Sequence, residues 1–363
     1  MGFSKNINEA RRQLMRNLTS GVGNSHQLSK KGRTIGIEVK RVFISRPNAR
    51  LGNLLLITPL VQEVVAAFPN CKIDLFVKGG AAPVIFKNYE HVDRIIQLPG
   101  KPFKNLASYI WQWTKIRKQT YDLVINADEN SSSGRLSAKF SNSGFKIFGE
   151  ADQSADKNPD LHHIAKKPVF SFRKNLEKMG FISYQKTIPL LDLKLTSFEM
   201  DRGKNALSKL ADPDKKTICI FTFATGEKCY SEAWWLTFYG KLKADYPGYN
   251  IIEILPMHNA SQIGFKAPAF YSKDIREIAS LIANTEVFIG ADSGMMHLAS
   301  AAQTTVVGLF SVTNIEKYRP YGNGSIAIDT NVGNLNDWFV QISKAIHTAV
   351  LRHNNNGDSE VAG

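Results

Sequence analysis

Short apolar runs alternate with longer segments of helical periodicity along most of this chain. In the first half, strands are predicted at 42–45 (VFIS), 72–77 (KIDLFV), 94–98 (RIIQL) and 121–126 (YDLVIN), and helices at 53–68, 83–87 and 106–117. A further helix is predicted after the segment SSSG at 131–134 and ends at about residue 140. Strands that alternate with helices form parallel sheets with helices on both faces. The pattern therefore predicts an α/β fold of the doubly wound class.

The alternation weakens between residues 150 and 168, where the chain is polar, and then resumes. Further strands are predicted at 217–223 (TICIFTF), 250–255 (NIIEIL), 287–290 (VFIG) and 304–310 (TTVVGLF), and further helices at 231–245, 274–283 and 335–351. We therefore expect two Rossmann-like domains, at 41–185 and 200–335, with a basic extension at 1–40 and a C-terminal helix at 335–352. Ligands of such sheets bind outside the carboxyl ends of the strands, so a cleft is expected between the domains.

The segment IGADSGMMHLASAA, at 289–302, carries the most chemical information. A buried strand ends at Asp292, and a helix follows that Asp292 or Ser293 can cap. The first backbone N–H groups of a helix have no partner within it and lie at its positive dipole end, which suits a phosphate. Gly294 lets a ligand approach the backbone, and His297 lies one turn later on the same side. An ordinary strand, turn and capped helix has the same pattern.

A second segment, TFATGEKCYSEAWW at 222–235, also follows a strand and precedes a helix. It begins with Thr222, and Lys228 adds a point positive charge at the same edge of the sheet. Lys228 and the helix start after Asp292 are expected to clamp a diphosphate from two sides. A surface lysine before a helix is the alternative for this segment taken alone.

A third segment, RPNARLGNLLLITP at 46–59, repeats the order of strand, tight turn and helix. It is not a G-x-G-x-x-G, and the chain contains no G-x-x-x-x-G-K-[ST], so neither a dinucleotide fingerprint nor a P-loop is present. Arg46, Arg50 and Arg135 each follow an apolar strand by a few residues. Arginine suits phosphate and carboxylate groups, so these three are candidate contacts for an anionic acceptor.

The chain resembles glycosyltransferase family 9, the heptosyltransferases, from about residue 41 to residue 346. The resemblance rests on R-x-x-x-LGN and TPL in the third segment, KCYSEAWW in the second, DSGMMHLASAA in the first, and LFSVTN and YRPYG after it. It implies a GT-B fold whose C-terminal domain binds a nucleotide-diphosphate sugar and whose N-terminal domain binds the acceptor. The implied reaction is inverting, needs no metal or other cofactor, and moves heptose from ADP-heptose to lipopolysaccharide at the cytoplasmic face of the inner membrane.

The resemblance also implies roles for individual residues. Lys228 would contact the diphosphate, and the backbone N–H groups of Ser293, Gly294 and Met295 would hold it, with Asp292 and His297 close by. Thr222 belongs with these donor-binding candidates.

Two positions depart from the family pattern. Asn53 stands where many members have an acidic general base, and an amide cannot accept the proton of a hydroxyl at neutral pH. Asp128 or Glu129 can serve instead, the acceptor can be activated in another way, or the protein binds nucleotide sugars without catalysis. The stretch at 255–261 also has no acid for the ribose hydroxyls, which leaves the sugar and the nucleotide open.

The net charge of +14 implies a partner of opposite sign, which can be nucleic acid, an anionic lipid or an acidic small molecule. Together with the resemblance, it fits an anionic glycolipid or glycan as partner and peripheral contact with a membrane. No nucleic-acid-binding motif is present, so nucleic acid is not expected as a partner. His162 and His163 have no partners at metal-ligand spacing, and no metal site is expected. We therefore expect a cytoplasmic glycosyltransferase.

Overall fold

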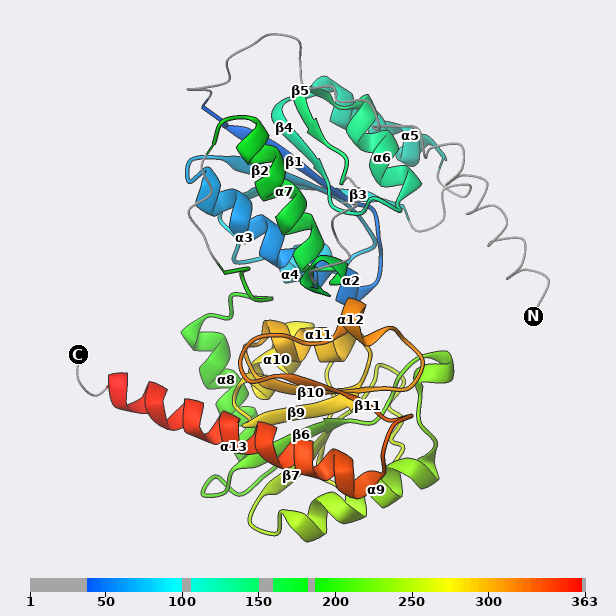
Figure 1. Cartoon of the computed structure of the whole chain (residues 1–363), viewed down its shortest axis with the longest axis vertical. Helices are drawn as coiled ribbons and strands as arrows, with labels where there is room; N and C mark the ends of the chain where they lie inside the picture. Colours follow the sequence, from blue (N-terminus) through cyan, green and yellow to red (C-terminus); the bar gives the residue numbers. More distant parts are fainter. Residues whose placement is uncertain (1–37, 100–105, 150–158, 182–186, 361–363) are drawn as a thin grey trace, which may run out of the picture. The chain divides into compact units, whose positions relative to one another are not determined.

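The computed structural model describes residues 38–99, 106–149, 159–181 and 187–360. The chain divides into two compact units, unit 1 (Met1–Pro189) and unit 2 (Leu190–Gly363), which are coloured blue to green and green to red in Figure 1. The predicted basic extension at 1–40 lies almost wholly outside the described residues. No helix within the described ranges is both long and apolar enough to cross a membrane.

Unit 1 contains a five-stranded parallel sheet in the order β3-β2-β1-β4-β5. Its strands are β1 (Arg41–Arg46), β2 (Lys72–Lys78), β3 (Val92–Leu98), β4 (Thr120–Asn126) and β5 (Asn142–Ile147). The central strand β1 is buried after its first residue, and its middle residues are apolar, because neighbours and helices cover both its faces. The strand order reverses between β1 and β4, which defines the switch point of this sheet.

Helices cover both faces of the unit 1 sheet (Figure 1). They are α2 (Leu51–Leu55), α3 (Thr58–Ala67), α4 (Ala82–Ile85), α5 (Leu106–Lys118), α6 (Ser132–Phe140) and α7 (Lys166–Lys178), with a 3₁₀ turn η3 at Pro159–His162. The single helix predicted at 53–68 is wrong in one respect, because it is divided between α2 and α3. Pro59 at the start of α3 explains the break, since proline has no N–H to continue the preceding helix. Strand β5, which is half-exposed, was not predicted.

Unit 2 contains a six-stranded parallel sheet in the order β11-β10-β9-β6-β7-β8. Its strands are β6 (Thr217–Phe221), β7 (Asn250–Ile254), β8 (Ala269–Phe270), β9 (Val287–Ala291), β10 (Thr305–Phe310) and β11 (Ile326–Asp329). Counted within the unit, this is the order 3-2-1-4-5-6 of the doubly wound nucleotide-binding fold. The switch point lies between β6 and β9, which are hydrogen-bonded neighbours.

The helices of unit 2 pack around this sheet. They are α8 (Ser197–Ser208), α9 (Glu232–Asp245), α10 (Ile275–Ala283), α11 (Gly294–Ala301), α12 (Ile315–Tyr318) and α13 (Leu335–Glu360), with a 3₁₀ turn η4 at Gly226–Lys228. Helix α11 lies close to β10, because a Cβ atom at Gly308 would meet the Met296 sulfur at 2.7 Å. This close packing fixes the position of α11, and with it the start of the helix, relative to the carboxyl edge of the sheet.

Helix α8, which was not predicted, is tied to α10 by a buried ion pair. Arg276 donates to both carboxylate oxygens of Glu199, at 2.6 and 2.8 Å, and also to the backbone oxygen of Leu193. Hydrogen bonds from Arg276 lower the pKa of Glu199 to about 2. The first residues of unit 2 are therefore fixed to the body of that unit.

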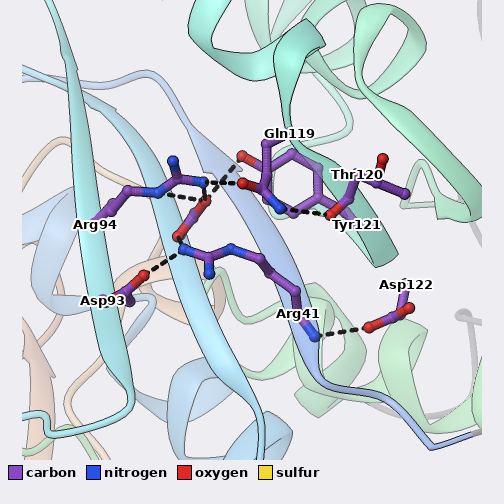
Figure 2. A network of polar contacts seen from close by, with 8 residues as sticks. Arg41, Asp93, Arg94, Gln119, Thr120, Tyr121 and Asp122 are labelled. Atoms are coloured by element: carbon purple, nitrogen blue, oxygen red, sulfur yellow. Dashed lines mark hydrogen bonds and ion pairs between the residues drawn. The ribbon is translucent and has the colours of Figure 1, made fainter.

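The amino edge of the unit 1 sheet holds a second charged network, drawn in Figure 2. Asp74 is fully buried and accepts hydrogen bonds from Arg41 at 2.9 Å, Arg94 at 3.1 Å and the Tyr121 hydroxyl at 2.9 Å. Burial and the neighbouring carboxylate raise the pKa of Tyr121. Asp93, which is more exposed, pairs with Arg41 from the other side. The network joins β1, β2, β3 and β4 at the edge opposite to the carboxyl ends of the strands.

Candidate active site

The carboxyl edge of the unit 2 sheet brings the first two sequence segments together at its switch point. Strand β6 leads through Thr222 to η4, which ends at Lys228, and strand β9 leads directly to Asp292. The Lys228 Nζ lies 3.1 Å from Asp292 Oδ2. Sequence positions separated by 64 residues therefore form one ion pair at the place where ligands of doubly wound sheets bind.

The two partners of this pair differ in exposure. The Asp292 side chain is 6% exposed and that of Lys228 is 27% exposed. The Thr313 hydroxyl, in the segment after β10, donates to Asp292 Oδ2 at 2.6 Å. The buried Asp292 carboxylate thus fixes the position of the more exposed Lys228 ammonium. Thr313 is a member of the site that the sequence analysis did not single out.

Helix α11 begins beside this pair. Ser293 is its N-cap, and the Ser293 hydroxyl accepts a hydrogen bond from the Met296 backbone N–H at 3.4 Å. The backbone N–H groups of Gly294 and Met295 come earlier in the first turn, where helix geometry provides no acceptor four residues back. Ser293, Gly294 and Met295 are partly exposed, while Met296 and His297 are buried. The exposed first turn therefore presents donors and a positive dipole end.

Thr222 contributes to the shape of the site through a buried carboxylate. Its hydroxyl donates to Glu253 Oε1 at 2.5 Å and accepts from the Gln262 backbone N–H at 3.1 Å. Ser261 donates to Glu253 Oε2 at 2.6 Å. Glu253 is fully buried in β7, and this burial raises the pKa of its carboxyl group. The Thr222 side chain thus fixes the loop after β7. The sequence analysis did not single out Glu253, which is a lone acid in the apolar run NIIEIL.

Tyr230 holds the other end of the lysine loop. Its hydroxyl lies 2.8 Å from the Thr330 hydroxyl after β11, and its ring stacks on Trp234 at a centroid distance of 4.1 Å. Desolvation raises the pKa of Tyr230. Trp235 is fully buried in the core of unit 2, in agreement with helix-to-sheet packing, although its Nε1 has no hydrogen-bond partner among the described residues.

The carboxyl edge of unit 1 brings together three more of the predicted residues at the β1–β4 switch point. Arg46 ends β1 and is 3% exposed, and its guanidinium contacts the Asp128 carboxylate after β4 and the Asn53 Oδ1 in α2, the latter at 3.3 Å. The Asp128 side chain is 27% exposed. Asp128 Oδ1 also accepts from the Asn130 backbone N–H at 3.1 Å. Asn53 and Asp128 therefore share one buried cation.

The remaining candidates of unit 1 lie around this cluster. Glu129 pairs with Lys167 at 2.5 Å, and Glu129 Oε2 is a buried atom with no hydrogen-bond partner among the described residues. Arg135 donates from Nε to the backbone oxygen of Glu129 at 2.6 Å. Arg50 is exposed, and its backbone N–H is bonded to Asn48. Lys167 is a cation at this edge that the sequence analysis missed.

Among the residues that the structure describes, metal-ligating side chains do not gather at either edge. Within the part of the chain that the structure describes, no group of three or more His, Cys, Asp or Glu residues is placed to hold a metal ion. His163 is buried at the start of α7, where its Nδ1 accepts from the Ala165 backbone N–H at 3.2 Å. The cationic groups that the structure places at these edges are lysine and arginine side chains, together with the backbone N–H groups at the start of α11.

Comparison with known proteins places these residues in a family context. The model of Glycosyltransferase family 9 (heptosyltransferase) matches residues 272–339, which include Asp292 and all of α11. Lipopolysaccharide heptosyltransferase 3 of Escherichia coli is 24% identical over 292 residues, covering 76% of this chain and 85% of that protein.

Solved structures show the same fold at low sequence identity. A family 9 glycosyl transferase from Veillonella parvula matches with a TM-score of 0.63 at 16% identity, covering 85% of this chain and 90% of that chain. The E. coli heptosyltransferase WaaC with ADP-2-deoxy-2-fluoro heptose matches with a TM-score of 0.57 at 19% identity, covering 86% and 99%. The chain is therefore similar to glycosyltransferase family 9, as its motifs predicted, and these solved structures share its parallel α/β fold.

Proposed function

We propose that this protein is an inverting glycosyltransferase that moves a heptose or a similar sugar from a nucleotide-diphosphate donor to a lipopolysaccharide-type glycan. The observation that carries the proposal is the Lys228–Asp292 pair at the β6–β9 switch point, beside the capped start of α11. The similarity to family 9 supports the reaction class. ADP-heptose is the first donor to test, because a similar structure was solved with an ADP-heptose analogue.

The donor side of the reaction lies in unit 2. The Lys228 ammonium and the first-turn N–H groups of α11 supply positive charge where a diphosphate leaves. As the bond between the anomeric carbon and the diphosphate oxygen breaks, the negative charge grows on that oxygen and is stabilised by these donors. Since the ammonium and the helix supply this charge, we propose that transfer needs no metal ion.

The acceptor side lies in unit 1, and the proposal requires its carboxyl edge to meet that of unit 2 across a cleft. An acceptor hydroxyl forms the new bond to the anomeric carbon from the face opposite to the diphosphate, which inverts the configuration. We propose that its proton passes to Asp128, because this carboxylate is partly exposed and is held by Arg46 next to Asn53. Glu129 is a weaker candidate, since one of its oxygens is buried and the other is bound to Lys167. Arg50 and Arg135 would bind anionic groups of a glycolipid acceptor at the cytoplasmic face of the inner membrane, whereas the buried Arg46 would hold Asp128 in place.

Substitution of Lys228 tests the donor site. Lys228→Ala should lower kcat by about 100-fold or more, because an electrostatic contact to the leaving group acts mainly in the transition state. Turnover is measured with ADP-heptose and a lipopolysaccharide inner-core acceptor, and EDTA should not change the rate. Lys241→Ala is the control, since Lys241 in α9 pairs with Asp245 and lies over the Phe339 ring and is not one of the residues proposed to bind the donor. Normal turnover by Lys228→Ala would show that this role is wrong.

A second function, binding of nucleotide sugars without transfer, is favoured by one observation. Asn53 cannot accept a proton, and the nearby Asp128 carboxylate is already engaged by Arg46. A thermal-shift screen of nucleotide-diphosphate sugars, followed by calorimetry and a turnover assay, separates the two functions. Tight binding of a donor with no transfer to any inner-core acceptor would favour the silent protein.

A further inference from the structure

Helices α5 and α6 lie together on one face of the unit 1 sheet and expose an unusual combination of side chains (Figure 1). Trp111 on α5 is 56% exposed, and Phe140 at the end of α6 is 48% exposed. Trp113, between them in sequence, packs instead on Phe76 and Phe140, at centroid distances of 5.7 and 5.9 Å. The inner side of α5 therefore anchors the helix to the sheet, and Trp111 is left on its outer side.

The charges on these two helices have a single sign. Their sequences, LASYIWQWTKIRK and SSGRLSAKF, contain five cationic residues and no aspartate or glutamate. The cations are Lys115, Arg117, Lys118, Arg135 and Lys139. An ordinary solvated face mixes both signs, so a pair of helices with cations alone creates a local positive field.

Lysine and tryptophan meet on one stripe of α5. Lys115 and Lys118 follow Trp111 by four and seven residues, which places them on the same side of the helix. The Lys118 ammonium lies 5.7 Å from the centroid of the Trp111 ring. The α5–α6 surface is defined here by Trp111, Lys115, Arg117, Lys118, Lys139 and Phe140.

We propose that the α5–α6 surface binds the headgroup layer of an anionic lipid bilayer, with Trp111 inserted at the interface. Tryptophan favours the boundary between water and acyl chains, and lysines on long flexible stems reach anionic headgroups from the same helix. A protein partner would need a broad apolar core depleted of charge, whereas this surface carries isolated rings among cations. Charge complementarity therefore selects a membrane of acidic phospholipids.

This proposal rests on the proposed function in one respect, because an enzyme whose acceptor is linked to a lipid has to reach the membrane. Helix α5 connects β3 to β4, and Asp128 lies two residues after the end of β4. The helix spans about 20 Å along the sheet at 1.5 Å per residue. If a bilayer lies along this helix, a glycolipid in that bilayer would extend its sugars to the carboxyl edge of unit 1.

Vesicle binding by the full chain tests the proposal without donor or acceptor. Vesicles of phosphatidylethanolamine with phosphatidylglycerol are compared with vesicles of phosphatidylcholine alone, by co-sedimentation. Wild-type protein should bind the anionic vesicles far more tightly. The double variant Lys115→Gln/Lys118→Gln should lose about 25-fold in affinity, at about fivefold for each lysine near the surface. Trp111→Ser should reduce binding by a smaller factor, and all variants should keep the thermal unfolding midpoint.

A matched control comes from α8 of unit 2, where Phe198 is 69% exposed and Lys204 and Lys209 are exposed as well. Phe198→Ser and Lys204→Gln/Lys209→Gln should leave vesicle binding unchanged. Equal losses in the control and α5 variants, or no binding by wild-type protein, would overturn the proposal. It would also be overturned if the α5 variants lost affinity for a generic nucleic-acid duplex and kept that for vesicles.

Turnover with a deacylated acceptor separates this inference from the proposed function. The α5 variants should process that soluble acceptor at the wild-type rate. Failure of Lys228→Ala to lose activity would contradict the reaction and leave the vesicle result intact.

Discussion

The two edges of the unit 1 sheet both hold an arginine–carboxylate cluster, but they bury opposite members. At the amino edge, the Asp74 side chain is fully buried, while the side chains of Arg41 and Arg94 are 24% and 42% exposed. At the carboxyl edge, Arg46 is 3% exposed and its partner Asp128 is 27% exposed. A buried member has its hydrogen bonds within the protein, and an exposed member can exchange its partner for a ligand. The amino edge therefore buries its carboxylate among hydrogen-bond partners, whereas the carboxyl edge leaves its carboxylate partly exposed, as the proposed role of Asp128 requires.

The ion pair of unit 2 also has one buried and one more exposed member, but here the carboxylate is the buried one. Asp292 is buried and Lys228 is partly exposed, so the cation is the member that a ligand can contact. An anionic leaving group requires a cation, and a proton acceptor requires a carboxylate. The exposed member of each carboxyl-edge pair thus matches the role that we propose for its unit.

Substitution of the buried carboxylate should have the largest effect. Asp74→Asn removes the charge that compensates two arginines and should lower the free energy of unfolding by about 3 kcal/mol, as for one partner removed from a buried ion pair. Urea unfolding of the purified chain measures this. Asp93→Asn, at the exposed end of the same network, should cost less than about 1 kcal/mol. Equal effects of the two substitutions would show that burial does not distinguish these carboxylates.

Substitution at the opposite edge should affect the rate as well as the stability. Asp128→Asn should lower kcat by about 100-fold, the usual contribution of a general base, and it should also lower the free energy of unfolding because it leaves the buried Arg46 without a carboxylate. The neighbouring Glu129→Gln is the control and should lower kcat by less than about tenfold. A larger loss in Glu129→Gln than in Asp128→Asn would assign the base to Glu129.

The smallest effect is expected for Asn53→Asp. This change places a second carboxylate beside Arg46, whose guanidinium can donate hydrogen bonds to both, so we expect kcat within about threefold of the wild type if Asp128 already takes the proton. The rate is measured over a range of pH with the donor saturating. A large gain in activity from an otherwise inert protein would instead indicate that the natural chain lacks a working base.

The carboxyl edges could be predicted from the sequence because their residues follow apolar strands. Arg46, Asp128, Lys228 and Asp292 each stand at or just after such a run, and parallel strands bring their carboxyl ends to one edge. Which of them would touch was open, since Arg46 reaches Asp128 across 82 residues only through the pairing of β1 with β4.

The buried acids could not be predicted in the same way. Asp74 and Glu253 lie inside apolar strands, where a charge is stable only if distant residues supply hydrogen bonds. Their partners come from other segments, Arg94 for Asp74 and Ser261 for Glu253. No local sequence pattern therefore predicts these contacts. Helix α8, in contrast, had a local signal that was overlooked: Thr196 and Glu199 form a capping box at its start.

Asp292 also gives Lys228 a permanent counter-ion. A solitary ammonium at a protein surface attracts any small anion in solution, whereas this ammonium must exchange a carboxylate 3.1 Å away for the newcomer. An anion with one negative charge gains little from that exchange, and a pyrophosphate group gains more because it carries more charge than it displaces. In the proposed donor site, the pair would therefore favour a diphosphate over the monovalent anions of the surrounding solution.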